Sequence, residues 1–473
     1  MSAATATGPA ATVDVAHEAG TSRVGPRTDG ADLRVTIGEP LRLAILGGRD
    51  SASVAAAYAA ALAANVEVVL ALTTAAHGSL IDRATALRDA RPDAVIIVAE
   101  KRDQDATIDL IEALRLARGS SAGPIAMLVA AEERTRVRIA ATAGPMAMEA
   151  IPGPLTEHAR EAIVARLRGM RRGAGEIVLR DEAIEAAARA LAASSGRSTL
   201  IVDVSGSTTS LALASTTGTV TAVHARLGIG PGADRIVAGA GLDRVRRWIP
   251  RAIDAPALLE RVFNRARWPD AVAPSASALA LEMALAREAL AHLLREAQRA
   301  GLDLSPLRAA QTIVATGDLA RLPRPSQTTL VILDALGPTG THLVAREHPD
   351  ALVVAGAIAT RTAADVAGTT EDVALVATLW PKRTSDATVI DAAVRSDERI
   401  GRGSFVLVPT DGPVELRIKG VRRSQRAGPL SLGVVFDARG RPLDIPARDA
   451  ERLPTISRWH TALAALPLDE AGA

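Results

Sequence analysis

The sequence predicts an α/β protein that ends in a β-rich domain. From residue 41 onward, short apolar runs alternate with stretches of helical periodicity, at the spacing of a parallel sheet between helices. From residue 371 onward, short runs of alternating polarity are separated by closely spaced Gly and Pro turns, which is typical of β structure.

The composition excludes several classes of protein. The 473 residues are too many for one compact core, and a hydrophobic content of 48% with 23% charged residues is typical of globular domains. A formal net charge of +2 does not indicate a nucleic-acid partner. The absence of cysteine excludes disulfides and thiolate metal sites. No apolar stretch is long enough for a membrane span and no signal peptide is visible, so we expect a cytoplasmic protein without membrane contact.

The first half of the chain predicts a tail and then a domain. Residues 1–38 are small, polar and aperiodic, which predicts a disordered tail. Residues 39–150 predict an N-terminal α/β domain. Its expected strands lie at 41–48, 66–72, 93–99 and 124–130.

The second half predicts a connector and two further domains. Residues 151–196 are amphipathic and predict a helical connector. Residues 197–368 begin with an antiparallel meander and continue with a long helical section, whose clearest helix covers 278–301. Residues 369–473 form the β-rich domain.

One turn in the meander has the composition of an anion-binding site. In TLIVDVSGSTTSLAL (199–213) a strand ends on Asp203, and Gly206 allows a close approach to the backbone N–H groups of the turn. Additional hydroxyl donors are supplied by Ser205, Ser207, Thr208 and Thr209. Asp203 beside a phosphate suits Mg²⁺ held through water. The alternative is a plain hairpin whose Asp and Ser side chains satisfy the turn backbone.

A second turn, in IVATGDLARL (313–322), joins an apolar strand to the start of a helix through Thr316 and Gly317. Such a turn can pack against an adenine or a phosphate, or it can be a simple strand-to-helix junction. The rest of the sequence offers no catalytic constellation, because the histidines are scattered and no nucleophile elbow is present.

The order of these pieces resembles the glutamate mutase L family, the MutL-like activators of B12-dependent glutamate mutase. This family belongs to the actin/Hsp70/sugar-kinase ATPase superfamily. The resemblance covers about residues 41 to 460, and its most specific segment is DARGRPL (437–443). It implies an actin-like (RNase H-like) fold with two phosphate-binding hairpins beside a cleft, ATP or ADP with Mg²⁺ as cofactor, and a B12-dependent mutase as partner.

The resemblance extends to single residues of the two turns. The family's VDIGGATTD hairpin is matched at Asp203, Gly206, Ser207, Thr208 and Thr209, and its GTGG-like turn at Thr316 and Gly317. Ser210 and Asp318 depart from these patterns. Nothing in residues 1–60 matches the family's first D-x-G-S-T hairpin. Because hydrolysis needs stabilisation of the phosphoryl group from both sides of the cleft, the resemblance implies nucleotide binding without efficient turnover.

Two functions follow from the resemblance. The first is a nucleotide-dependent activator or chaperone of a B12-dependent mutase, with ATPase activity left open. The second is an inactive pseudo-ATPase scaffold that binds a protein partner. The chain is not expected to be the mutase itself, because it lacks a D-x-H-x-x-G cobalamin loop and therefore has no B12 site.

Overall fold

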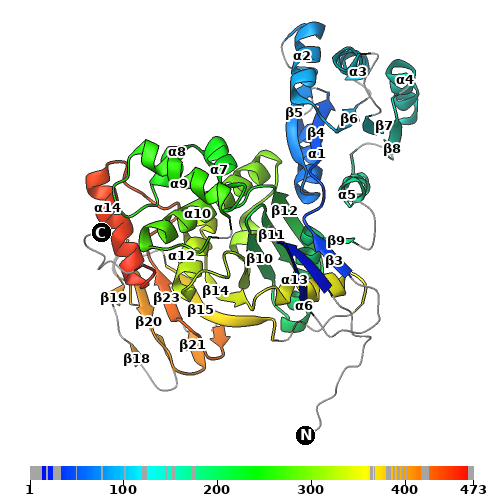
Figure 1. Ribbon diagram of the computed structural model, residues 1–473. Coiled ribbons are helices and arrows are strands. Elements are labelled where there is room, and N and C mark those ends of the chain that lie inside the picture. Colours follow the sequence, from blue (N-terminus) through cyan, green and yellow to red (C-terminus); the bar gives the residue numbers. More distant parts are fainter. Residues whose placement is uncertain are drawn as a thin grey trace.

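The chain folds into mixed α/β structure with a parallel five-stranded sheet, a mixed eight-stranded sheet and smaller β elements (Figure 1). The computed structural model describes residues 13–17, 20–24, 33–48, 51–75, 78–100, 103–119, 125–144, 146–151, 155–172, 177–269, 271–362, 366, 368–379, 385–386, 389–390, 395–396, 399–400, 403–416 and 425–466. Within these ranges, no helix is both long and apolar enough to cross a bilayer.

A five-stranded parallel sheet is formed by strands between residues 42 and 151. In sheet order it contains β5 (Glu67–Thr73), β4 (Arg42–Gly47), β6 (Ala94–Ala99), β7 (Ala126–Ala131) and β8 (Met148–Ile151). One face is covered by α2 (Leu80–Ala90), α3 (Gln104–Arg118) and α4 (Glu133–Ala143), and the other by α1 (Ser51–Ala63) and α5 (Glu157–Arg171). Helices on both faces explain why β4, β6 and β7 are almost entirely apolar.

An eight-stranded sheet forms the centre of the larger body. Its order is β12 (Val220–Ala225), β11 (Thr209–Ala214), β10 (Thr199–Val204), β13 (Thr312–Gly317), β14 (Thr341–Glu347), β15 (Thr370–Thr378), β23 (Gly433–Asp437) and β20 (Phe405–Val408). Strands β10, β11 and β12 are an antiparallel meander, which confirms the sequence prediction. Strand β10 then pairs in parallel with β13, and β13 with β14.

Helices cover both faces of this sheet. One face carries α6 (Arg180–Ser195) and α13 (Ala351–Ala359). The other carries α7 (Ala233–Ala240), α8 (Leu242–Arg246), α9 (Ala255–Arg267), α10 (Ala276–Arg299), α12 (Pro325–Leu336) and α14 (Asp449–Ala462), with the short α11 (Ser305–Arg308) nearby. Helices α6 and α13 touch closely because Gly356 has no side chain. A Cβ there would lie 2.0 Å from the carbonyl oxygen of Ala183.

A small sheet includes part of the segment 1–38, for which the sequence predicts a disordered tail. It contains β2 (Gly20–Val24), β1 (Val13–His17), β3 (Leu33–Thr36) and β9 (Ile177–Leu179), in that order. The rest of the predicted tail lies outside the described residues, apart from Ile37 and Gly38. These strands are short, and β3 gains its neighbour β9 from a segment far along the chain. The local periodicity of a sequence does not indicate pairing with such a distant strand.

The small sheet repeats part of the large one. In both, an antiparallel hairpin is followed by two strands parallel to its first strand: β2-β1-β3-β9 and β11-β10-β13-β14. The five-stranded domain is therefore an insertion between β3 and β9, and Figure 1 shows it standing away from the larger body.

Two predicted domain boundaries differ from the structure. The connector over 151–196 is divided, because α5 packs on the inserted sheet and α6 on the eight-stranded sheet. The β-rich segment 369–473 is divided too, because β15, β20 and β23 extend the central sheet while its other strands form two small sheets. The remaining strands are β16 (Ser385–Asp386), β17 (Val389–Ile390), β18 (Arg395–Ser396), β19 (Arg399–Ile400), β21 (Val414–Leu416) and β22 (Gln425–Ala427).

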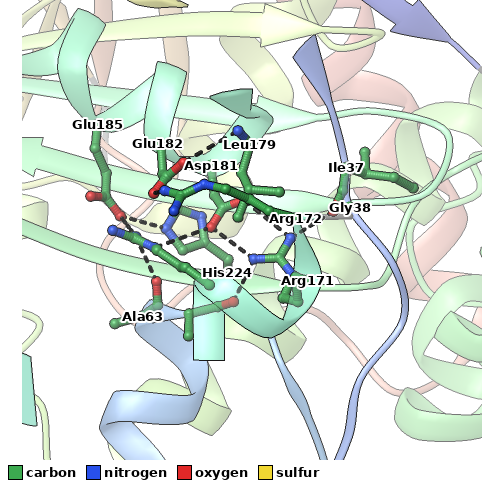
Figure 2. A network of polar contacts seen from close by, with 12 residues as sticks. Ile37, Gly38, Ala63, Arg171, Arg172, Leu179, Asp181, Glu182, Glu185 and His224 are labelled. Atoms are coloured by element: carbon green, nitrogen blue, oxygen red, sulfur yellow. Dashed lines mark hydrogen bonds and ion pairs between the residues drawn. The ribbon is translucent and has the colours of Figure 1, made fainter. Parts of the chain in front are cut away.

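An ion-pair network, the base network, fastens the inserted domain to the body (Figure 2). Arg171 at the end of α5 is fully buried. Its guanidinium donates to Ala64 O at 2.5 Å, to Ile37 O at 2.6 Å and to both oxygens of Asp181 at 3.0 and 3.2 Å. Glu185, one turn further along α6, pairs with Arg168 and lies 3.0 Å from His224 Nε2. Both linkers of the insertion are therefore held at α6.

The segment DARGRPL (437–443) fastens the C-terminal part in a similar way, and we call this the C-terminal clasp. Arg439 pairs with Asp437 (Nη2–Oδ2 3.0 Å) and with Asp334 on α12 (Nη1–Oδ1 2.6 Å). Its guanidinium carbon also lies 3.7 Å from the ring centre of Phe405 and 4.6 Å from that of Trp459. These contacts tie β20, α12 and α14 together.

Candidate functional site

A cavity of about 570 Å³ lies where strand ends of the small and large sheets meet. Its wall includes Thr36 and Ile37 at the end of β3, Arg180 after β9, Ser205 and Gly206 after β10, and Gly317 and Asp318 at the end of β13. Ligands of open α/β sheets bind outside the carboxyl ends of parallel strands. This cavity is therefore the candidate site.

The β1–β2 hairpin ends at the same edge. Val15 pairs with Val35, the residue before Thr36, so the end of β1 lies level with residues that line the cavity. Residues 1–60 were expected to hold no counterpart of the first phosphate hairpin. The structure corrects this for topology, because a hairpin stands there in a position equivalent to β10–β11. Its sequence is nevertheless not D-x-G-S-T.

Of the predicted turn residues between β10 and β11, Ser205 and Gly206 line the cavity. The Thr208 hydroxyl lies 2.9 Å from Ser205 Oγ, which also accepts from Thr208 N at 3.3 Å. Thr209 Oγ1 donates to Leu227 O at 2.7 Å. Ser207 is half-buried. The Ser205 hydroxyl also donates to Thr208 O at 3.2 Å. The Ser205, Thr208 and Thr209 side chains thus all bond within the protein, as the plain-hairpin alternative expects, while Ser205 and Gly206 form part of the cavity wall.

A glycine-rich loop supports this turn from behind. Ile229 N donates to Ser205 O at 3.0 Å, and Gly230 N donates to Gly206 O at 2.9 Å. The loop approaches so closely that a Cβ on Gly228 would lie 2.1 Å from Gly206 O. The turn is therefore held rigid, and rigid placement of donors favours binding without reorganisation.

Asp203 is fully buried and paired with Arg180. Arg180 Nη2 lies 2.8 Å from Oδ1 and Arg180 Nε lies 3.2 Å from Oδ2. Burial alone would lower the pKa of Arg180, but the charge of Asp203 raises it instead. Since both oxygens accept from Arg180, Asp203 does not fit the role of a Mg²⁺ ligand through water. Among the described residues, no group of three or more His, Asp or Glu side chains is placed to hold a metal ion.

Of the two predicted residues at the second turn, Gly317 lines the cavity and Thr316 does not. Thr316 is buried and its hydroxyl donates to Glu347, which also accepts from Gly317 N at 3.0 Å. Burial raises the pKa of Glu347 despite these hydrogen bonds. Gly317 lines the cavity with φ +68°, and a Cβ there would lie 2.6 Å from Asp203 Oδ1. Only glycine gives this backbone conformation without strain.

Several charged residues of the wall were not expected from the sequence. Besides Arg180 and Asp318, they are Arg265, Glu282, Arg321 and Asp350. Arg265 pairs with Glu282 at 3.3 Å, and Arg321 pairs with Asp350 at 3.0 Å. Burial raises the pKa values of Asp318 and Glu282. The sequence offered one sign of this charged wall, because Asp318 departs from the glycine of the GTGG-like turn. Arg180 follows a strand of only three residues, and no sequence pattern marked it as a site residue.

Comparisons with known proteins give little support for an assignment. No family model matches the chain, and no curated protein matches it. Among solved structures, it is similar to a carbohydrate kinase from Novosphingobium aromaticivorans, with 13% sequence identity and a TM-score of 0.23. The match covers 50% of this chain and 55% of the kinase. A likeness this weak carries no conclusion about function.

Proposed function

We propose that this chain is an actin-like nucleotide-binding protein related to glutamate mutase L, and that it activates a B12-dependent mutase without hydrolysing ATP. The proposal rests on one observation: a cavity of about 570 Å³ lies at the edge where the strand ends and hairpins of two similarly ordered sheets meet. The resemblance of the sequence implies the same arrangement, with a phosphate-binding hairpin on each side of a nucleotide.

The state of Asp203 supports binding without hydrolysis. Phosphoryl transfer in ATPases depends on metal ions that neutralise the developing charge on the phosphates. The carboxylate expected to position Mg²⁺ is instead engaged by Arg180 through both oxygens. The same observation favours the second candidate, a pseudo-ATPase scaffold, should the cavity bind no nucleotide.

Calorimetric titration with Mg-ATP and Mg-ADP tests nucleotide binding, and phosphate release tests turnover. We expect binding and no release above background. Ala271→Trp places a large side chain at the exposed wall of the cavity and is expected to weaken binding. Ala309→Trp, at an exposed position of no cavity-lining segment, is the matched control. Wild-type protein that binds neither nucleotide would overturn this function and leave the scaffold.

The partner is tested separately with a purified B12-dependent mutase inactivated by loss of intact cofactor. An activator is expected to restore mutase activity in a nucleotide-dependent way. Restoration that ignores nucleotide supports the scaffold, and no restoration contradicts the mutase assignment.

A further inference from the structure

We propose that Arg180 takes the place of a metal ion in this cavity, so that the site binds the phosphates of a nucleotide without Mg²⁺. This rests on the proposed nucleotide function and adds the ionic form of its ligand and the residue that selects it. It follows from a disagreement: the position expected to hold a metal through Asp203 holds a guanidinium.

The Asp203 carboxylate is fully buried near the end of β10, and each of its oxygens accepts one hydrogen bond from Arg180. The Gly317 backbone crowds Oδ1 from the other side, since even a Cβ there would lie 2.6 Å away. A hydrated cation would have to displace Arg180 from both carboxylate oxygens, whereas the present pair neutralises the buried carboxylate.

Arg180 has more hydrogen-bond donors than Asp203 uses. Asp203 accepts from the Nε–H and from one Nη2 hydrogen, and a guanidinium carries further N–H groups in the same plane. Arg180 lines the cavity together with Ser205, Gly206 and Gly317. A phosphate beside the β10–β11 turn therefore meets a fixed cation, and arginine matches phosphate oxygens in bidentate geometry.

The other two arginines of the cavity wall, Arg265 and Arg321, bind acidic partners of their own. Arg265 is committed to Glu282 and to the carbonyl oxygens of Ile229 and Ala271. Arg321 donates to both oxygens of Asp350. Arg180 is the arginine paired with Asp203, which lies on β10 just before the first turn and beside Gly317 of the second.

The test is calorimetric titration of the full chain with ATP, once in EDTA and once in Mg²⁺. We expect comparable affinities in the two buffers. The informative variant is Asp203→Asn, which frees Arg180 from its counter-charge and is expected to tighten ATP binding in EDTA by about tenfold. A metal-binding Asp203 predicts the opposite, since loss of the carboxylate would then weaken binding.

Removal of Arg180 needs a variant that still folds. Arg180→Gln alone leaves Asp203 buried without a counter-charge, so the double variant Arg180→Gln with Asp203→Asn is used. It is expected to lose binding in EDTA by at least about tenfold. Arg138→Gln, at a half-exposed surface pair with Asp105, controls for the loss of one positive charge. Thermal unfolding confirms that each variant is folded.

The outcomes separate the two proposals. Binding in EDTA that tightens in Asp203→Asn and disappears in the double variant supports the role of Arg180. Binding that requires Mg²⁺ and is lost in Asp203→Asn overturns this inference and leaves the proposed nucleotide function intact. No binding of ATP in either buffer overturns the nucleotide function itself.

Discussion

At the scale of single residues, two neighbours in the first turn of α6 serve different parts of the molecule. Arg180 pairs with Asp203 at the cavity, while Asp181 pairs with Arg171 in the base network. Both side chains are buried, so each pair lacks the screening that makes surface ion pairs weak. The first turn of α6 is therefore a rigid junction between the cavity and the inserted domain.

The Asp181 pair gives a prediction for stability and its pH dependence. Asp181→Asn leaves Arg171 buried without a counter-charge and is expected to lower the free energy of unfolding by about 3–5 kcal/mol at pH 7. Burial alone would raise the pKa of Asp181, but Arg171, His224 and Arg168 lower it overall. Because the pKa of Asp181 is lower in the folded than in the unfolded protein, its ionised form stabilises the fold at pH values above the unfolded pKa of about 3.9. This stabilisation is lost as the pH falls through the lower, folded-state pKa.

Urea unfolding at pH 7 and at lower pH measures the difference between wild type and Asp181→Asn. The difference is expected to shrink as the solution becomes acidic. Asp105→Asn, at an exposed pair with Arg138, should change stability much less. A pH-independent difference would contradict the assignment to the Asp181 carboxylate.

Gly317 gives a second prediction at this scale. Gly317→Ala combines a left-handed backbone with a Cβ 2.6 Å from Asp203 Oδ1 and 2.7 Å from Val204 O. Gly218→Ala has a similar φ of +83° and no atom within 4 Å of the added Cβ. Both lose about 1–2 kcal/mol from the backbone conformation, and Gly317→Ala is expected to lose more. Thermal unfolding of the two variants compares them directly, and equal losses would contradict the crowding.

At the scale of elements, the C-terminal clasp joins segments that come from three places in the chain. Arg439 contacts Asp334 on α12, Asp437 at the end of β23, Phe405 on β20 and Trp459 on α14. The sequence segment that carries the strongest family resemblance therefore has a packing role visible in the structure. Its removal should loosen the C-terminal elements before the rest of the fold.

Arg439→Met tests this role. It leaves the buried carboxylates of Asp334 and Asp437 with fewer partners and is expected to destabilise the protein by about 3–5 kcal/mol. Hydrogen exchange should rise first in β20 and α14. Arg160→Met, at a surface pair with Glu157, is the control and should leave exchange unchanged. Uniform loosening of the whole chain would contradict a local clasp.

The elements also show what local sequence determines. Strands β4, β6 and β7 are almost continuous apolar runs, because both faces of their sheet are covered, and such runs are visible without a structure. The run at 329–336 is equally apolar but lies in helix α12, since apolarity alone does not distinguish a buried strand from a buried helix. Strands β1 and β3 were missed, and β3 depends on a partner far along the chain, β9.

The candidate site shows the same division. The position of Asp203 at a strand end followed from its sequence neighbours. The partner of Asp203 did not, because Arg180 reaches it from the first turn of α6, 23 positions earlier in the chain. A side chain that neutralises a predicted ligand leaves no local pattern, so metal binding was expected where an ion pair stands.

At the scale of the whole molecule, the inserted domain is anchored at its base. Arg171 holds the incoming linker through Ile37 and the end of α1 through Ala64, while Arg226 donates to Gly38 O and Glu39 O. On the far side of α1, the Tyr58 hydroxyl donates to Glu296 on α10 at 2.5 Å. The domain therefore has several fixed contacts with the body.

Arg171→Met tests the anchoring. We expect faster hydrogen exchange at residues 37–40 and 63–66, because three hydrogen-bonded segments lose their common donor. The neighbouring Arg172→Met removes only a partly exposed pair with Glu182 and should leave these segments protected. Exchange that is unchanged in both variants would show that the linkers are held by other contacts.

The sharing of one sheet by β14 and β15 limits how the chain can be shortened. A protein cut at residue 368, where the sequence suggests a border, would expose the backbone of β14 along the edge that β15 now covers. Bare strand edges recruit strands of other molecules. Such a fragment is prone to self-association, and the last hundred residues are needed to keep the central sheet from becoming a template for aggregation.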